Sequence, residues 1–91
     1  MDDLDTKLKR YFTVTKKTLQ QIKVQRAEIN DEKSAKDFLD MAQRYYADGE
    51  YFLKKGDKLN ALVAVTYAHA WLDAGARLNI FKVKDSNILM Q

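Results

Sequence analysis

A helical hairpin over residues 45–81 limits the fold of this chain more than any other feature of the sequence. Gly56 and Asp57 separate two helix-compatible segments. Glycine readily takes the left-handed conformation that ends many helices. The Asp57 carboxylate can accept hydrogen bonds from the backbone of Asn60 or Leu59 and so start the next helix. Because a stop signal is followed at once by a start signal, we predict two antiparallel helices joined by a tight turn.

The second helix of this hairpin is apolar on two sides. It carries no formally charged residue between Leu59 and Leu72. One stripe at helical spacing holds Ala61, Val65, Ala68, Leu72 and Ala76, and the other holds Val63, Tyr67, Ala70, Trp71, Ala74 and Leu78. A surface helix needs only one such stripe. We therefore expect this helix to be the innermost of a bundle or to lie in an interface. Val63, Tyr67, Trp71 and Leu78 are the candidate residues for an interface with a second copy or a partner protein.

The same segment resembles a known family. The residues that carry the resemblance are Tyr46, Asp48, Tyr51, Phe52, Gly56, Asp57, Ala61, Leu62, Tyr67 and Ala68, and above all the run Trp71-Leu72-Asp73-Ala74-Gly75 with Leu78. Together they are similar to the signature of domain-of-unknown-function family 357, a family of short archaeal helical proteins. The resemblance implies a small three-helix bundle. It implies no activity, because the family has none assigned.

The rest of the sequence also favours an all-α fold. The 91 residues include no proline and no alternating apolar pattern of strand length. We predict an up-down-up three-helix bundle over residues 1–81, with helices at about 3–27, 35–55 and 58–79. Ser34 and Asp37 are spaced like a capping box at the start of the second helix. The C-terminal tail, residues 82–91, either folds back onto the third helix or is flexible.

Two glycines inside the predicted helices need a packing reason, because glycine costs about 1 kcal/mol relative to alanine there. Gly49 lies on the inward stripe of the second helix and comes level with about Ala64 and Val65. Gly75 comes level with about Phe38. We expect close backbone approach, or room for an aromatic ring, at both positions.

The net charge of +3 is concentrated in the first helix. Residues 1–30 carry seven basic and four acidic side chains, whereas residues 31–91 carry nine of each. Lys9, Lys16, Lys17 and Lys23 lie on the face opposite the apolar seam, with no acid between Thr6 and Ala27. Such a row can contact nucleic-acid phosphates. It is also typical of a solvated face of a lysine-rich protein, which we favour.

The sequence offers no constellation for catalysis. Without cysteine it has no disulfide, thiolate metal site or thiol nucleophile, as is usual in the cytoplasm. His69, the one histidine, is expected to be packed and hydrogen-bonded, and Asp73 to form an ion pair with Arg77. The acidic start of the chain does not resemble a secretory signal. We expect no catalytic, cofactor or metal site, no membrane association and a cytoplasmic location.

These observations favour a non-enzymatic protein-interaction or scaffolding module that self-associates or binds a partner protein. The alternative is an accessory protein that binds RNA through the basic face of the first helix.

Overall fold

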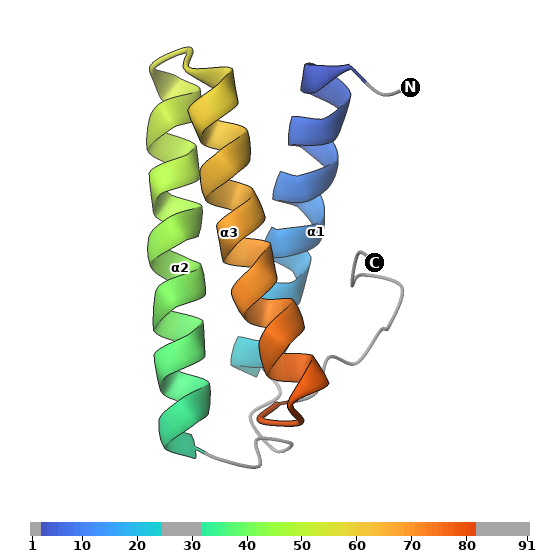
Figure 1. Ribbon diagram of the computed structural model, residues 1–91, viewed down its shortest axis with the longest axis vertical. Coiled ribbons are helices and arrows are strands. Elements are labelled where there is room, and N and C mark those ends of the chain that lie inside the picture. Colours follow the sequence, from blue (N-terminus) through green and yellow to red (C-terminus); the bar gives the residue numbers. More distant parts are fainter. Residues whose placement is uncertain (1–2, 25–31, 82–91) are drawn as a thin grey trace.

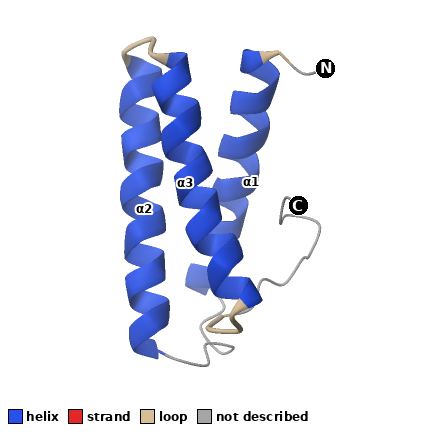
Figure 2. Ribbon diagram, in the orientation of Figure 1, coloured by secondary structure: helices blue, strands red, loops and turns tan. Residues whose placement is uncertain are grey.

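A computed structural model of the chain describes residues 3–24 and 32–81 (Figure 1). Three helices occupy most of them: α1 (Leu4–Val24), α2 (Glu32–Lys54) and α3 (Lys58–Arg77). No strand occurs among the described residues (Figure 2). α1 and α3 begin at the same end of the molecule, and α2 runs in the opposite direction (Figure 1). The predicted all-α, up-down-up three-helix bundle is confirmed.

The turn between α2 and α3 forms as the sequence predicts. Gly56 has a φ of +79°. Its N–H donates to the Leu53 carbonyl at 3.1 Å, and the Asp57 N–H donates to the Phe52 carbonyl at 2.9 Å. This pair of bonds is the Schellman motif, which satisfies carbonyls at the end of a helix. The Asp57 carboxylate then accepts from the Asn60 N–H at 3.1 Å and caps α3.

The start of α2 corrects the prediction. The helix begins at Glu32 rather than near Ala35, so Ser34 lies inside the first turn and is not the capping residue. An acidic side chain at Glu32 suits the positive end of the helix dipole, and it pairs with Lys36 one turn later at 3.7 Å. The predicted last residues of the first helix, the linker after it and the tail at 82–91 lie outside the described residues.

α3 is the central helix of the bundle. It packs against both α2 and α1, whereas α1 and α2 contact each other little. Figure 1 shows α3 beside α2 and in front of α1. Four residues of its first apolar stripe are fully buried: Ala61, Val65, Ala68 and Leu72. The second stripe is on the other side of the helix, and much of it is exposed.

The seam that α1 offers to the bundle is partly polar. Leu8, Leu19 and Ile22 are buried there, and Thr15 and Thr18 are fully buried as well. The Thr18 hydroxyl donates to the Val14 carbonyl at 2.9 Å within the helix. The side of α1 that faces the bundle therefore buries less hydrocarbon than an all-aliphatic seam would.

Both helical glycines make room for aromatic rings. A Cβ built at Gly49 would come within 3.1 Å of the Phe12 ring and 3.5 Å of the Ala61 carbonyl oxygen. A Cβ at Gly75 would lie 2.4 Å from the Phe81 ring. The prediction of room for a ring is confirmed at both positions. The ring nearest to Gly75 is that of Phe81, six residues further along the chain, whereas the Phe38 ring meets Trp71.

Phe81 reaches Gly75 because the chain reverses again after α3. Asn79 has a φ of +58°. Its N–H donates to the Ala76 carbonyl at 3.1 Å, and the Ile80 N–H donates to the Gly75 carbonyl at 3.0 Å. This is a second Schellman motif, with asparagine in the left-handed position. It returns Phe81 into the core cluster, whose buried members are Leu19, Ile22, Ala35, Ala42, Leu72 and Phe81.

Candidate functional site

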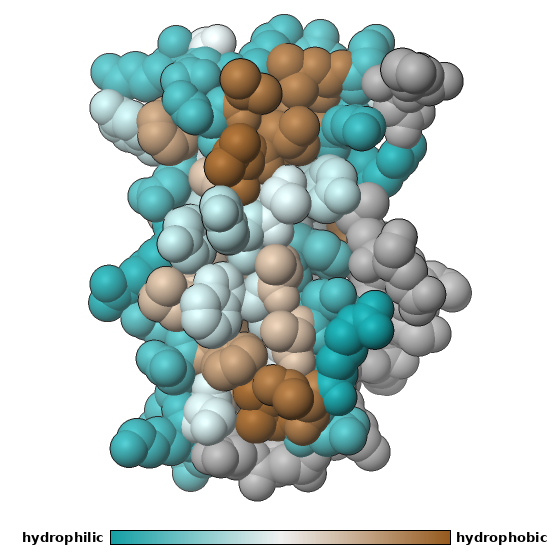
Figure 3. Space-filling view, in the orientation of Figure 1, coloured by the Kyte–Doolittle hydropathy of each residue, from teal (hydrophilic) through white to brown (hydrophobic). Residues whose placement is uncertain are grey.

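The outer side of α3 carries most of the large hydrophobic side chains that are exposed among the described residues. We define the outer face of α3 as Leu59, Val63, Tyr67, Ala70, Ala74 and Leu78. Leu59 is 67 % exposed, Val63 47 % and Tyr67 55 %. Figure 3 shows two strongly hydrophobic areas near the two ends of α3, joined by paler residues and bordered by hydrophilic ones. Soluble proteins use such contiguous patches most often for binding.

The helix itself places these residues on one side. They recur at steps of four and three, which is the spacing of one face of an α-helix. The opposite side of α3 is already occupied by the core, with Val65 and Leu72 fully buried. Since α3 lies between α1 and α2, its outer face is the side that neither helix covers (Figure 1).

An open depression of about 350 Å³ lies in the half of this face nearer the α2–α3 turn. Val63 and Tyr67 line it together with Leu62, Thr66 and Ala70. Its lining therefore consists of hydrocarbon, one aromatic ring and one hydroxyl. Such a surface can accept an apolar side chain, and it presents no titratable group for acid–base chemistry except the Tyr67 phenol.

Aromatic contacts with α2 fix the large side chains on this surface. The Tyr67 ring stacks on Tyr45, with centroids 5.3 Å apart and planes at 26°. The Trp71 ring meets Phe38 edge-on at 5.0 Å and 89°. Because both rings are held by the protein itself, binding costs little side-chain entropy at these positions. Trp71 is partly buried by its contact, so less of it is open to a partner than of Tyr67.

The structure brings only some of the predicted interface residues together. Val63 and Tyr67 share the depression, whereas Leu78, 67 % exposed, caps the far end of α3. Leu59 was missed, although its position one turn before Val63 was a usable signal. Leu62 and Thr66, which line the depression beside Val63 and Tyr67, were also missed.

The basic face of α1 is exposed as the sequence predicts. Lys9, Lys16 and Lys17 all point into solvent. Lys23 belongs to the same helix, but its side chain lies outside the described residues. No acidic residue occurs in α1 after Asp5. The three described lysines therefore form a positive surface that is separate from the outer face of α3.

The remaining candidate residues have packing or surface roles. His69 is 6 % exposed and meets the Tyr11 ring edge-on at 6.0 Å, so it is packed as expected. The Arg77 Nε donates to both carboxylate oxygens of Asp73 at 3.1 Å, which confirms the predicted ion pair. Burial, with a smaller contribution from the Glu50 charge, raises the pKa of Tyr46 above 10.0.

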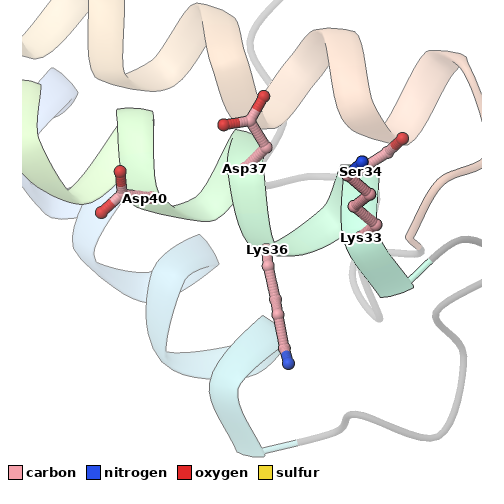
Figure 4. A pocket seen from close by; sticks show the side chains of 5 residues that line it. All are labelled: Lys33, Ser34, Lys36, Asp37 and Asp40. Atoms are coloured by element: carbon pink, nitrogen blue, oxygen red, sulfur yellow. The ribbon is translucent and has the colours of Figure 1, made fainter.

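A second hollow, at the start of α2, does not resemble a binding site. Its lining residues are Lys33, Ser34, Lys36, Asp37 and Asp40. Their side chains diverge, with Lys36 and Asp37 on opposite sides of the helix (Figure 4). A ligand site needs polar groups that converge on one point. In the described part of the chain, no three His, Asp or Glu residues lie where they could hold a metal ion.

No helix within residues 3–24 and 32–81 is both long and apolar enough to span a membrane.

Comparison with protein families gives a match to the family described as Protein of unknown function (DUF357), over residues 10–81. The matched segment runs from the second turn of α1 to Phe81, which closes the core. Neither curated proteins nor solved structures gave a match.

Proposed function

The chain belongs to the DUF357 family, and we propose that it is a non-enzymatic protein-interaction or scaffolding module that binds through the outer face of α3. The observation that carries this proposal is the exposure of Leu59, Val63 and Tyr67 on a helix with no charge between Leu59 and Leu72. A helix that is apolar on both its inner and its outer side is typically covered on both sides.

Several features support binding rather than chemistry. The depression beside Val63 and Tyr67 is lined by carbon atoms with a single hydroxyl and a phenol. Aromatic residues with fixed rings are frequent energetic centres of protein interfaces, and Tyr67 is such a residue. The absence of cysteine fits a cytoplasmic location, and the family resemblance suggests an archaeal source. Both are part of the proposal.

The test is affinity capture from a native lysate of the source organism, with and without nuclease. We expect a defined set of proteins that survives nuclease and is lost when the bait carries Tyr67→Ala. Tyr51→Ala is the matched control, because Tyr51 is exposed to the same degree, 57 % against 55 %, but lies about half a turn around α2 from buried Ala42. Equal capture by the two variants would refute a role for the outer face.

The second candidate function is RNA binding by the basic face of α1, which is favoured by the exposure of Lys9, Lys16 and Lys17. Contacts of this kind release counterions, so the logarithm of affinity falls with the logarithm of salt by about 0.7 per phosphate on single strands. We expect replacement of the three lysines by alanine to remove about two units of that slope. Alanine at Lys33 and Lys36, which are exposed on α2, is the control. An unchanged slope excludes this function.

A further inference from the structure

The positions on the outer face of α3 are symmetrical about its middle, and at two of the three paired positions the side chains are complementary in size. Reading inward from the two ends, Leu59 corresponds to Leu78, Val63 to Ala74, and Tyr67 to Ala70. Each pair is centred between residues 68 and 69. If two such helices lie antiparallel on each other, leucine meets leucine, and the larger Val63 and Tyr67 each meet an alanine. Large-against-small pairing is what allows helix surfaces to interlock.

Figure 3 shows where the hydrophobic surface lies along this face. The two strongly hydrophobic areas lie near the two ends of α3, and the paler zone lies between them. A two-fold axis through the middle of α3 would place one end area of the first copy on the opposite end area of the second. An isologous contact of this type uses the same patch on both subunits.

The charges around this face also suit a second copy. α3 has no charged residue from Leu59 to Leu72, so two identical faces meet without like charges between them. Two cations of α3 near its ends are paired within the chain. The Lys58 Nζ lies 2.8 Å from the Asp5 Oδ1 of α1, and the Arg77 Nε lies 3.1 Å from the Asp73 Oδ1. The lysines of the basic face are on the outer side of α1. Antiparallel helices also have a favourable interaction between their dipoles.

We propose that the outer face of α3 binds a second copy of this chain, antiparallel, with the two-fold axis at residues 68–69. This inference deepens the proposed interaction function and rests on it, since it names the partner of the same surface.

The size of the face limits the surface area that the contact can bury. Leu59 and Leu78 are about 28 Å apart along the helix, and a helix face is about 10 Å wide. The two faces together bury roughly 600 Å², half of what a stable interface usually needs. We therefore expect a weak, reversible contact at the lower end of the size range of specific interfaces.

The register can be tested because the native chain has no cysteine. Two full-length variants, Leu59→Cys and Leu78→Cys, are each treated alone and as a mixture with a bismaleimide that spans about the 8–10 Å between packed helices. The mixture is expected to give the mixed 59–78 product, and each variant alone to give little. In the proposed register two copies of position 59 are about 28 Å apart. Dominant 59–59 or 78–78 products overturn the antiparallel register.

Sedimentation of the full chain over a range of concentrations tests the association itself. We expect Ala70→Glu, which places a charge against the partner's Tyr67 ring, to raise the dissociation constant at least about tenfold. Tyr51→Glu is the control and leaves it unchanged. A chain that stays monomeric at every concentration measured overturns the homodimer. In that case the broader interaction function still stands if affinity capture yields proteins that are lost with Tyr67→Ala.

Discussion

The α2–α3 hairpin and α1 are built from the same kind of element but are held in place differently. The hairpin is closed by a Schellman turn and a capping carboxylate, and its helices approach closely at Gly49 and Ala61. α1 packs mainly against α3, through a seam that includes two buried threonines. The hairpin is therefore the structural centre of the domain, and α1 is the element that we expect to open first. Local stability of this kind varies within one native fold.

The largest expected effect comes from a buried side chain that packs against both regions. Phe81 packs in a cluster with Leu19 and Ile22 of α1 and with Leu72 of α3. We expect Phe81→Ala to lower the free energy of unfolding by about 3 kcal/mol, because it removes a fully buried ring. Chemical denaturation measures the loss. Hydrogen exchange should show faster opening in both regions, so this variant removes the difference in local stability between the hairpin and α1.

Gly75→Ala tests the contact between position 75 and the Phe81 ring directly. In the native chain the new methyl group meets the Phe81 ring, so stability falls. In the Phe81→Ala background the same substitution meets no ring, and alanine should then stabilise the helix by about 1 kcal/mol. The sign of the effect is therefore expected to reverse between the two backgrounds. A gain in stability in the native background contradicts the close contact.

The next effect concerns the hairpin alone. Gly56→Ala is expected to lower the free energy of unfolding by about 1 kcal/mol, because alanine is strained at a φ of +79°. There is open space around the position, so strain and not collision is the cause. Gly56→Asn is the control, since asparagine tolerates the left-handed conformation better. Thermal unfolding measures the change. If both variants lose the same free energy of unfolding, backbone strain at position 56 is not the cause.

A smaller effect of opposite sign is expected in α1. Thr15 is fully buried, and its hydroxyl has no hydrogen-bond partner among the described residues. We expect Thr15→Val to raise the free energy of unfolding by about 1 kcal/mol, because a buried hydroxyl without a partner is costly. Thr18→Val should bring no such gain, since the Thr18 hydroxyl is already bonded to Val14. If hydrogen exchange in α1 is slower in Thr15→Val than in the native chain, the local stability of α1 has come closer to that of the hairpin.

The smallest effect is the acid dependence at the start of α1. The Asp3 carboxylate accepts from the Thr6 N–H at 2.8 Å, and this bond lowers the pKa of Asp3 below 3.8. Because the folded pKa is the lower one, the contribution to stability is present above about pH 3.8 and is lost as the pH falls through the folded pKa. An NMR titration of Asp3 and the exchange rates of the first α1 amides measure it. Asp3→Asn should make those rates insensitive to pH in this range after correction for intrinsic exchange.

Much of the fold could be predicted because its signals are local. The Gly56–Asp57 pair shows where the chain turns, and the spacing of Leu8, Thr15 and Ile22 shows which side of α1 faces inward. The return of Phe81 to Gly75 could not be predicted. It depends on Asn79 taking a left-handed conformation, which asparagine adopts only in some contexts.

The candidate site was predicted to a similar extent. Val63 and Tyr67 follow from the second apolar stripe, which is a property of α3 alone. Leu62 and Thr66, which line the same depression, lie outside that stripe. The start of α2 was placed three residues late, because a serine that resembled a capping residue outweighed the helix-forming character of Glu32 and Lys33. Local capping patterns are tendencies that the tertiary structure can override.

The reversal at Asn79 also determines where this domain can be cut or joined to another protein. α3 ends at Arg77, and a boundary drawn there from secondary structure alone would discard the ring that closes the core. A fusion partner attached directly after Leu78 would remove or displace Ile80 and Phe81, whereas one attached beyond Phe81 would retain both buried side chains. For an expression library or a biosensor built on this chain, the four residues after Arg77 therefore have to be kept.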